Sequence, residues 1–138
     1  MGEEAGNVEL IKQAYKLWHD SKGGSVDHFV GLAAEDIKFG SIARGAEPLG
    51  FTAAINNRET MRGYFEGLLR EWQMLHYDVH QLVAQDDMVF ARCSTSWRNK
   101  KTGKAFDTPK ADFWRLRDGK IVEFYEYFDT AQVMAAAT

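Results

Sequence analysis

Apolar residues in the first half of the chain recur every three to four positions, which is the spacing of one face of a helix. This pattern predicts a helix from Asn7 to Ser21, a short helix from Ser25 to Leu32, and a third helix that ends near Trp72. At the start of the third helix, Asn56 and Glu59 have the spacing of a capping box. We therefore expect three helices in the N-terminal half.

After Trp72 the apolar residues alternate with polar ones, which is the spacing of one face of a strand. The predicted strands run from Tyr77 to Ala84, Met88 to Arg98, Lys104 to Leu116 and Ile121 to Phe128. Turn-forming residues separate them, such as Thr102-Gly103 and Asp118-Gly119. One earlier strand is expected at Ile37 to Phe39. Helices followed by an antiparallel meander indicate an α+β domain.

The segment from Gly40 to Ala54 has no regular pattern and joins the first strand to the third helix. It contains Pro48, and it carries the apolar residues Leu49 and Phe51. A long loop with apolar side chains usually covers a site, so we expect this segment to be a flap over a pocket.

Length and composition agree with one packed domain over residues 1–138, since 45% of the residues are hydrophobic. The net charge of −3, without a basic stripe, argues against a nucleic-acid partner. A single cysteine allows no disulfide within the chain. We find neither a signal peptide nor an apolar run of about 20 residues that could span a bilayer. The expected location is therefore the cytoplasm, without a membrane partner.

Each of the last two predicted strands carries one carboxylate on an otherwise apolar face. Asp112 lies on such a face of one strand, and Glu126 lies on such a face of the next. The apolar residues that alternate with them are Trp114, Leu116, Val122, Phe124 and Phe128. A carboxylate among apolar side chains is paired, exposed at an edge, or held with a shifted acidity. These two acids are therefore the first candidates for binding or catalysis.

Whether the two acids meet depends on the turn between the strands. If residues 117–119 form a three-residue loop, Asp112 lies opposite Phe124 and Glu126 is its diagonal neighbour on the same face. A two-residue turn would place the acids on opposite faces. We choose the three-residue loop because it gathers the apolar residues onto one surface. Glu126 could equally be a structural acid bonded to Tyr15 or to a helix N-terminus.

The opposite face of these strands is predicted to be an aromatic outer surface that carries one cation. Its residues are Phe113, Arg115, Tyr125 and Tyr127. Tyr and Arg are enriched in protein interfaces, so we expect a homodimer through this face. The alternative is that the chain's own tail covers it.

The remaining reactive side chains form no recognisable set. The four histidines lack the third ligand of a metal site, and Cys93 lies in no nucleophile motif. The sequence also contains no glycine-rich phosphate loop and no serine-centred elbow. We therefore expect neither a metal nor a cofactor.

The order of elements resembles the nuclear-transport-factor-2-like superfamily over essentially the whole chain, and the stretch from Lys101 to Asp129 is similar to its terminal hairpin. The likeness is greatest to the SnoaL-like polyketide cyclases and ketosteroid-isomerase-related members. This resemblance implies a cone-shaped half-barrel, in which a strongly curved mixed or antiparallel sheet packs on three N-terminal-half helices around an apolar pocket. The superfamily hosts isomerases, cyclases, dehydratases, epoxide hydrolases and non-catalytic partners, so the resemblance implies no single reaction.

Ketosteroid isomerases use a Tyr from the first helix and a protonated Asp from the penultimate strand as an oxyanion hole. The stretch Lys12-Gln-Ala-Tyr15 is similar around the tyrosine, and Asp112 is similar to the second donor. The Asp that moves the proton in those enzymes falls on Ser41, which cannot be that base. Steroid-type isomerisation is therefore not implied.

Limonene epoxide hydrolases are similar at the end of the chain. The stretch from Glu126 to Asp129 matches the one that begins with their catalytic Asp. Their partnering Arg and second Asp fall on Cys93 and Thr95, so this catalytic set is also incomplete.

The pattern and the resemblance together predict a pocket for a small, mostly apolar, cyclic or polyketide-like molecule. The expected catalytic residues are Glu126 as general acid or base, and Tyr15 with Asp112 as stabilisers of an enolate-like charge. The expected binding residues are Ser41, Phe39, Trp18, Trp97, Trp114, Phe124, Phe128 and Phe65. An enzyme of this kind would be a cofactor-independent isomerase, cyclase or lyase. The missing family bases favour the alternative of a non-catalytic ligand binder, and a protein-interaction module of the same fold is a third possibility.

Overall fold

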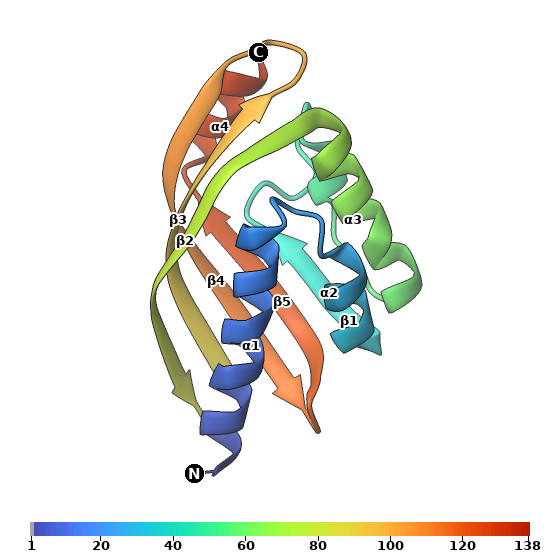
Figure 1. The fold of residues 1–138 in the computed structure, drawn as a ribbon. Coiled ribbons are helices and arrows are strands. Elements are labelled where there is room, and N and C mark those ends of the chain that lie inside the picture. Colours follow the sequence, from blue (N-terminus) through green and yellow to red (C-terminus); the bar gives the residue numbers. More distant parts are fainter. Residues whose placement is uncertain (1) are drawn as a thin grey trace.

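The computed structural model describes residues 2–138, which form one five-stranded sheet and its covering helices (Figure 1). The helices are α1 (Gly2–Asp20), α2 (Val26–Leu32), the 3₁₀ turn η1 (Gly50–Thr52), α3 (Arg58–Glu71) and α4 (Thr130–Ala137). The strands are β1 (Ala33–Ser41), β2 (Trp72–Gln85), β3 (Met88–Asn99), β4 (Ala105–Arg117) and β5 (Lys120–Phe128). The predicted α+β class is confirmed.

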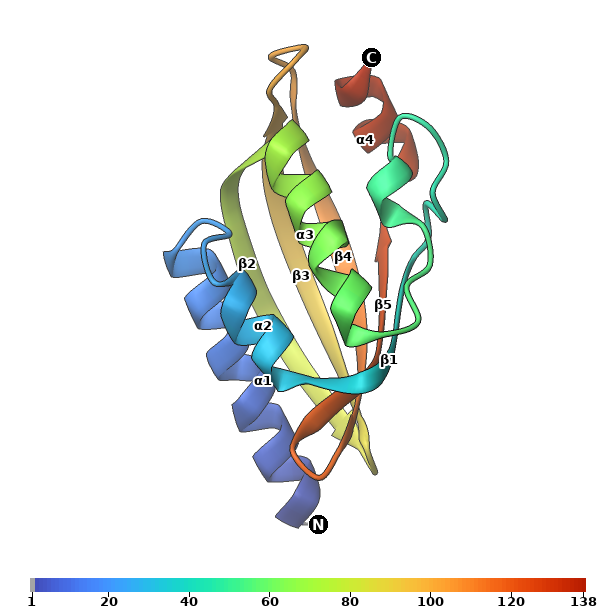
Figure 2. The same ribbon diagram turned by 90° about the vertical axis from the view of Figure 1, so that its right-hand side faces the viewer.

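The strand order is β1-β5-β4-β3-β2, with β1 parallel to β5 and all other pairs antiparallel. The sheet twists along its length, and its edge strands β1 and β2 stay apart (Figures 1 and 2). The predicted strong curvature into a half-barrel is therefore wrong. Bulges bend a sheet locally, and the pairs β1–β5, β2–β3 and β4–β5 contain register shifts, but the central pair β3–β4 runs without any.

Helices from the N-terminal half cover one face of the sheet (Figure 2). Helix α1 packs on β2 and β3, α3 packs on β1 and η1, and α2 lies against both α1 and α3. Helix α4 packs on β4 and β3 near one end of the sheet. The most deeply buried apolar residues lie between these layers and include Ile11, Ile37, Met61, Val89, Leu116 and Ile121. None of the helices within residues 2–138 is long and apolar enough to span a membrane.

The connection between β4 and β5 is a two-residue turn. Arg117 pairs with Lys120, and Asp118 and Gly119 between them have φ values of 52° and 76°. Two consecutive positive φ values are typical of the type I′ turns that close tight hairpins, and Asp-Gly is a favoured sequence for them. The predicted three-residue loop is therefore wrong.

A bulge in β5 follows this turn and returns Phe124, Glu126 and Phe128 to the face of the sheet that was predicted for them. Leu116 pairs with Ile121 and Arg115 pairs with Glu123, so Val122 is an extra residue in β5. Ile121 is consequently fully buried at the position predicted for Val122, which is only partly buried.

The turn and the bulge together place the two carboxylates opposite each other. A two-residue turn alone would put them on different faces, and the extra residue returns them to one face. Asp112 therefore pairs with Glu126, whereas the sequence predicted Phe124 as its partner. The shared face is confirmed, although the predicted register is wrong.

The outer face of the sheet carries the predicted aromatic residues. Phe113 packs against Phe90 with ring centroids 5.1 Å apart, and Tyr125 packs against Tyr127 at 4.9 Å. Phe90 is 47% exposed and Tyr127 is 45% exposed, so α4 does not cover them. Arg115 forms ion pairs across this face, with Asp87 at 2.8 Å and Glu123 at 3.2 Å. Homodimerisation through this face stays a prediction.

The N-terminus of α3 is capped by Asn57, whose side-chain oxygen accepts a hydrogen bond from the backbone N–H of Thr60 at 2.9 Å. The predicted cap, Asn56, lies one residue too early. Asn57→Ala should lower the free energy of unfolding by about 1 kcal/mol, because one N–H at the helix start loses its acceptor. Urea denaturation measures this loss. The exposed Asn56→Ala is the matched control, and an equal loss in both variants would contradict the assignment.

Candidate functional site

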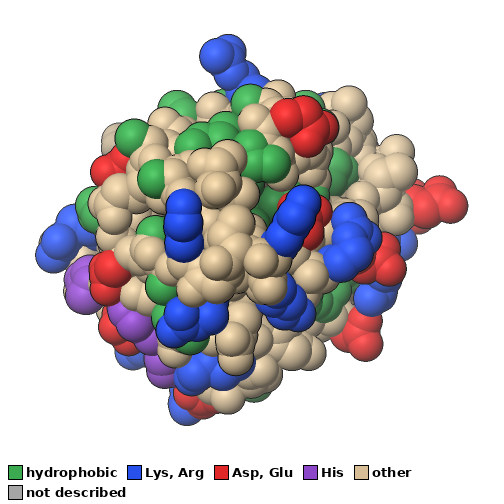
Figure 3. Space-filling view, turned by 90° about the horizontal axis from the view of Figure 1, so that it is seen from above, with side chains coloured by type: hydrophobic (Ala, Val, Ile, Leu, Met, Phe, Trp, Pro, Cys, Tyr) green, Lys and Arg blue, Asp and Glu red, His purple; other side chains and the backbone are tan. Residues whose placement is uncertain are grey.

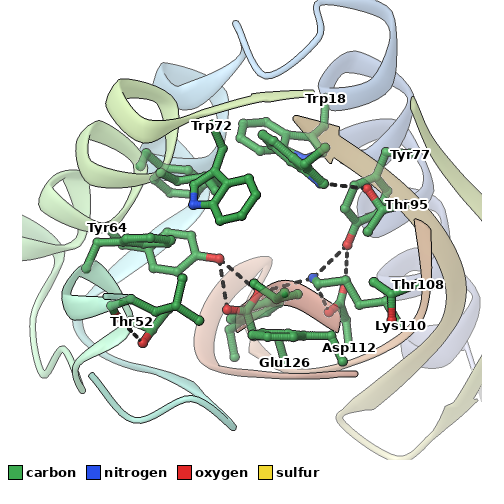
Figure 4. Close-up of a pocket in the computed structure, with 18 of the residues that line it drawn as sticks. Trp18, Thr52, Tyr64, Trp72, Tyr77, Thr95, Thr108, Lys110, Asp112 and Glu126 are labelled. Carbon is green, nitrogen blue, oxygen red and sulfur yellow. Dashed lines mark hydrogen bonds and ion pairs between the residues drawn. The ribbon is translucent and has the colours of Figure 1, made fainter. Parts of the chain in front are cut away.

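A cavity of about 90 Å³ lies between the helices and the inner face of the sheet (Figure 4). Its walls are mostly aromatic side chains from α1, α3 and all five strands. The predicted binding residues that line it are Trp18, Phe39, Phe65, Trp97, Trp114, Phe124 and Phe128. The flap also contributes, as predicted, through Leu49, Phe51 and Thr52.

Ser41 is the predicted binding residue that does not line the cavity. Its side chain is buried, and its hydroxyl accepts a hydrogen bond from the backbone N–H of Ala43 at 3.3 Å. In the parallel pairing of β1 with β5 it lies next to Glu126. Ser41 is therefore buried beside Glu126 but does not contact the cavity.

A surface groove adjoins the cavity at Phe51, which lines both spaces. Figure 3 views this end of the molecule and shows cationic and acidic side chains close together. The charged residues of the groove are Glu47, Arg70, Glu71, Lys100 and Lys101. Neither sign of charge dominates this surface.

A buried lysine holds the two carboxylates together at the floor of the cavity. Lys110 lies two residues before Asp112 on β4, so both side chains point to the same face. Its Nζ is 2.7 Å from Asp112 Oδ1, 3.2 Å from Glu126 Oε1 and 2.8 Å from the Tyr77 hydroxyl. The contacts with Asp112 and Tyr77 are hydrogen bonds, and the contact with Glu126 is an ion pair. The Lys110 side chain is only 10% exposed.

Asp112 is saturated with hydrogen-bond donors. Its Oδ2 accepts from the hydroxyls of Tyr15 at 2.5 Å and Tyr77 at 2.7 Å, while Lys110 donates to Oδ1. The indole N–H of Trp114 in turn donates to the Tyr15 hydroxyl at 2.8 Å. Three donors converge on this carboxylate, which therefore anchors its neighbours.

Glu126 has fewer donors than Asp112. The Tyr64 hydroxyl lies 2.8 Å from its Oε1 and 2.9 Å from its Oε2. Tyr64 has a single proton to share between these oxygens. Lys110 forms an ion pair with Oε1, so Oε2 retains accepting capacity, and Glu126 lines the cavity. Figure 4 shows this carboxylate below the open space, between Tyr64 and Lys110.

Burial and the neighbouring charges decide which groups near the floor can ionise. Burial raises the pKa of Tyr15, Tyr64 and Tyr77 well above the ordinary value, and the nearby carboxylates raise it further. Burial lowers the pKa of Lys110, but the attraction of Asp112 and Glu126 outweighs burial and leaves that pKa raised. The tyrosines therefore stay neutral at neutral pH. Lys110 stays a cation and cannot act as a nucleophile.

Cys93 lies close to the same floor but does not offer a thiolate. Burial raises the pKa of its thiol to about 12, and the charge of Asp112 adds to this shift. Within residues 2–138, no group of three or more His, Cys, Asp or Glu side chains is arranged to hold a metal ion.

The structure thus brings the three predicted catalytic residues, Tyr15, Asp112 and Glu126, into one cluster. The sequence analysis missed Lys110 and Tyr77, which complete it. For Lys110 a signal was present, because it continues the alternation of Asp112 along one face of its strand. For Tyr77 the pairing partner lies on a distant strand, so spacing carried no signal.

The raised tyrosine pKa values predict an alkaline transition. Because the folded pKa of Tyr15, Tyr64 and Tyr77 exceeds the unfolded value of about 10, their contribution to stability is complete below that pH. It is lost as the pH rises toward the folded value. At a pH of about 11 we expect these three to remain un-ionised in the native protein and to ionise on unfolding. Tyrosinate absorbance, followed together with circular dichroism, tests this; ionisation of all five tyrosines in folded protein would contradict it.

Both a family model and solved structures of other proteins match this chain. A SnoaL-like domain family model matches residues 11–124. Comparison with curated proteins finds no match in sequence. Among solved structures, an NTF2-like protein of unknown function from Burkholderia pseudomallei has a TM-score of 0.84 at 14% identity, over 96% of this chain and 97% of that one.

Two further solved structures share the fold. A hypothetical protein with a ketosteroid isomerase-like fold from Catenulispora acidiphila, in complex with trimethylamine, has a TM-score of 0.76 at 18% identity, over 94% of this chain and 92% of that one. A putative SnoaL-like polyketide cyclase from Jannaschia sp. has a TM-score of 0.76 at 17% identity, over 97% and 92%. At these identities the likeness shows the fold alone. The family model covers most of the chain, which therefore belongs to the SnoaL-like domain family.

Proposed function

We propose that the cavity binds a small organic molecule and that Glu126 accepts a proton from it. The observation that carries this proposal is a buried carboxylate on the cavity wall whose Oε2 receives only a shared hydrogen bond from Tyr64. Such an oxygen can take a further donor without displacing one. No other carboxylate that lines the described cavity has this property.

Asp112 and Tyr15 take a different role here from the one predicted. Asp112 accepts three hydrogen bonds from its neighbours, and Tyr15 already donates its proton to Asp112. Both are therefore positioning residues, which hold Lys110 and the tyrosines in place. They would not stabilise an oxyanion directly.

Trp72 offers the donor that a ligand oxygen needs. Its indole N–H has no hydrogen-bond partner among residues 2–138, although the side chain is only 2% exposed and lines the cavity. Figure 4 shows the Trp72 ring beside the same open space as Glu126. A carbonyl oxygen of the ligand would accept a hydrogen bond from this group.

The reaction that fits these groups is proton transfer next to a carbonyl. Glu126 Oε2 takes a proton from the carbon beside the carbonyl, and the bond's electron pair moves to form an enolate whose oxygen accepts from Trp72. Return of the proton to another carbon gives an isomerase, whereas departure of a leaving group gives a lyase. Neither course needs a cofactor.

The cavity size limits the ligand. A volume of about 90 Å³ corresponds to roughly six to nine water-sized groups. A cyclic or polyketide-like molecule would therefore place one part inside and the remainder at the mouth, where Phe51, Phe106 and Phe128 are partly exposed. The trimethylamine complex of the Catenulispora protein agrees with a small ligand in a protein of this fold.

Binding without catalysis is the second candidate, and one observation favours it. The polar side chains at the floor satisfy one another through a closed network of Tyr15, Tyr77, Lys110 and Asp112. Because this network is complete without a ligand, shaping a binding site is a sufficient role for it, and catalysis is not required.

Glu126→Gln tests the choice, because glutamine keeps the size and the contact with Tyr64 but cannot take the proton. Turnover of a panel of small ketones and lactones should fall by about 100-fold or more, with ligand binding retained. Glu123→Gln, on the outer face of the same strand, is the matched control and should keep full turnover. Unchanged turnover in Glu126→Gln would refute the acid–base role. Binding without turnover in the wild type would establish the passive binder.

A further inference from the structure

We infer that the cavity selects a ligand with one positive charge, in the form of a compact alkylated ammonium group. This inference rests on the proposed function, since it uses Glu126 as the group that faces the ligand. It adds the chemical class of the molecule, which neither the fold nor the family determines.

The first step is the charge of the cavity wall. Among the described residues that line it, the ionisable side chains that carry charge are Lys110, Asp112 and Glu126. Tyrosines on the wall are neutral at neutral pH. One cation and two carboxylates give this wall a formal net charge of −1. An unbalanced charge among apolar side chains is unfavourable until a counter-charge or a proton joins it.

The second step is the place of this excess charge. Asp112 receives three donors, and Lys110 is hydrogen-bonded to Asp112 and Tyr77 and ion-paired with Glu126 Oε1. Glu126 Oε2 is left with the shared Tyr64 proton alone. The unbalanced charge therefore lies on Glu126, whose carboxylate adjoins the open space (Figure 4).

The third step is the surface around that oxygen. Aromatic rings attract cations through the negative potential of their faces, and Trp is the strongest of them. The cavity is lined by Trp18, Trp72 and Trp97, together with Tyr64. A cation already lies against these walls, since Lys110 Nζ is 5.2 Å from the ring centroid of Tyr77. The same walls can hold a second cation next to Glu126.

The number of free acceptors selects the kind of ammonium. A primary ammonium loses three water hydrogen bonds on entry, and Glu126 Oε2 is the spare carboxylate oxygen available on the described wall. A tertiary or quaternary ammonium has one N–H or none, so it needs aromatic faces and a counter-charge rather than acceptors. A volume of about 90 Å³ accommodates such a group.

Choline and its neutral isostere 3,3-dimethylbutan-1-ol test the inference, because they differ in charge but hardly in shape. Isothermal titration of the wild-type protein should show choline binding about tenfold tighter or more. In Glu126→Gln the net charge of the wall becomes zero, and this preference should disappear. Glu123→Gln, whose change is on the outer face, should keep it. Circular dichroism checks that each variant is folded.

Equal or tighter binding of the neutral isostere to the wild type would overturn the inference, even if Glu126→Gln does not fold. A preference for choline that survives in folded Glu126→Gln would overturn it as well, as would the failure of both probes to bind. The proposed function fails separately. It falls if the wild type turns over none of the ketones and lactones, or if their turnover does not depend on Glu126.

Discussion

The buried ammonium of Lys110 lies between two carboxylates that face each other across neighbouring strands, Asp112 at 2.7 Å and Glu126 at 3.2 Å. Like charges directly opposite in a sheet repel, and burial among aromatic rings strengthens this repulsion. The positive charge of Lys110 attracts both carboxylates and offsets their mutual repulsion. Tyr15 and Tyr77 add hydrogen bonds to Asp112. Asp112, Tyr15 and Tyr77 thereby satisfy one another at the floor of a largely aromatic cavity, and Glu126 Oε2 keeps accepting capacity.

Hydrogen-bond capacity distinguishes the two acids, although their types and positions are similar. Asp112 is surrounded by donors and serves as an anchor, whereas Glu126 accepts a hydrogen bond from Tyr64 and forms an ion pair with Lys110. The assignment of the proton acceptor follows from this difference. The predicted pairing of Tyr15 with Asp112 is present as a contact, but its donor is occupied.

The sequence predicted the elements of the fold from local spacing, and it failed where distant pairing decides the outcome. Periodicity identified the helices, the meander and the shared face of Asp112 and Glu126. The tight Asp-Gly turn and the bulge at Val122 were both missed, and their effects on the face cancel. The parallel pairing of β1 with β5 and the flatter sheet depend on contacts that spacing does not encode. Lys110 was overlooked because a lysine in a strand is usually solvated.

The most direct measurement is the stability of Lys110→Met as a function of pH. Methionine fills the space without a charge, so at neutral pH the free energy of unfolding should fall by about 3–5 kcal/mol. The deficit relative to the wild type should shrink as the pH is lowered, because one of the two facing carboxylates then takes up a proton and the repulsion ends. Lys101→Met, at an exposed position, should be close to the wild type at every pH. A Lys110→Met protein as stable as this control, or a deficit that does not change with pH, would contradict the central role of the lysine.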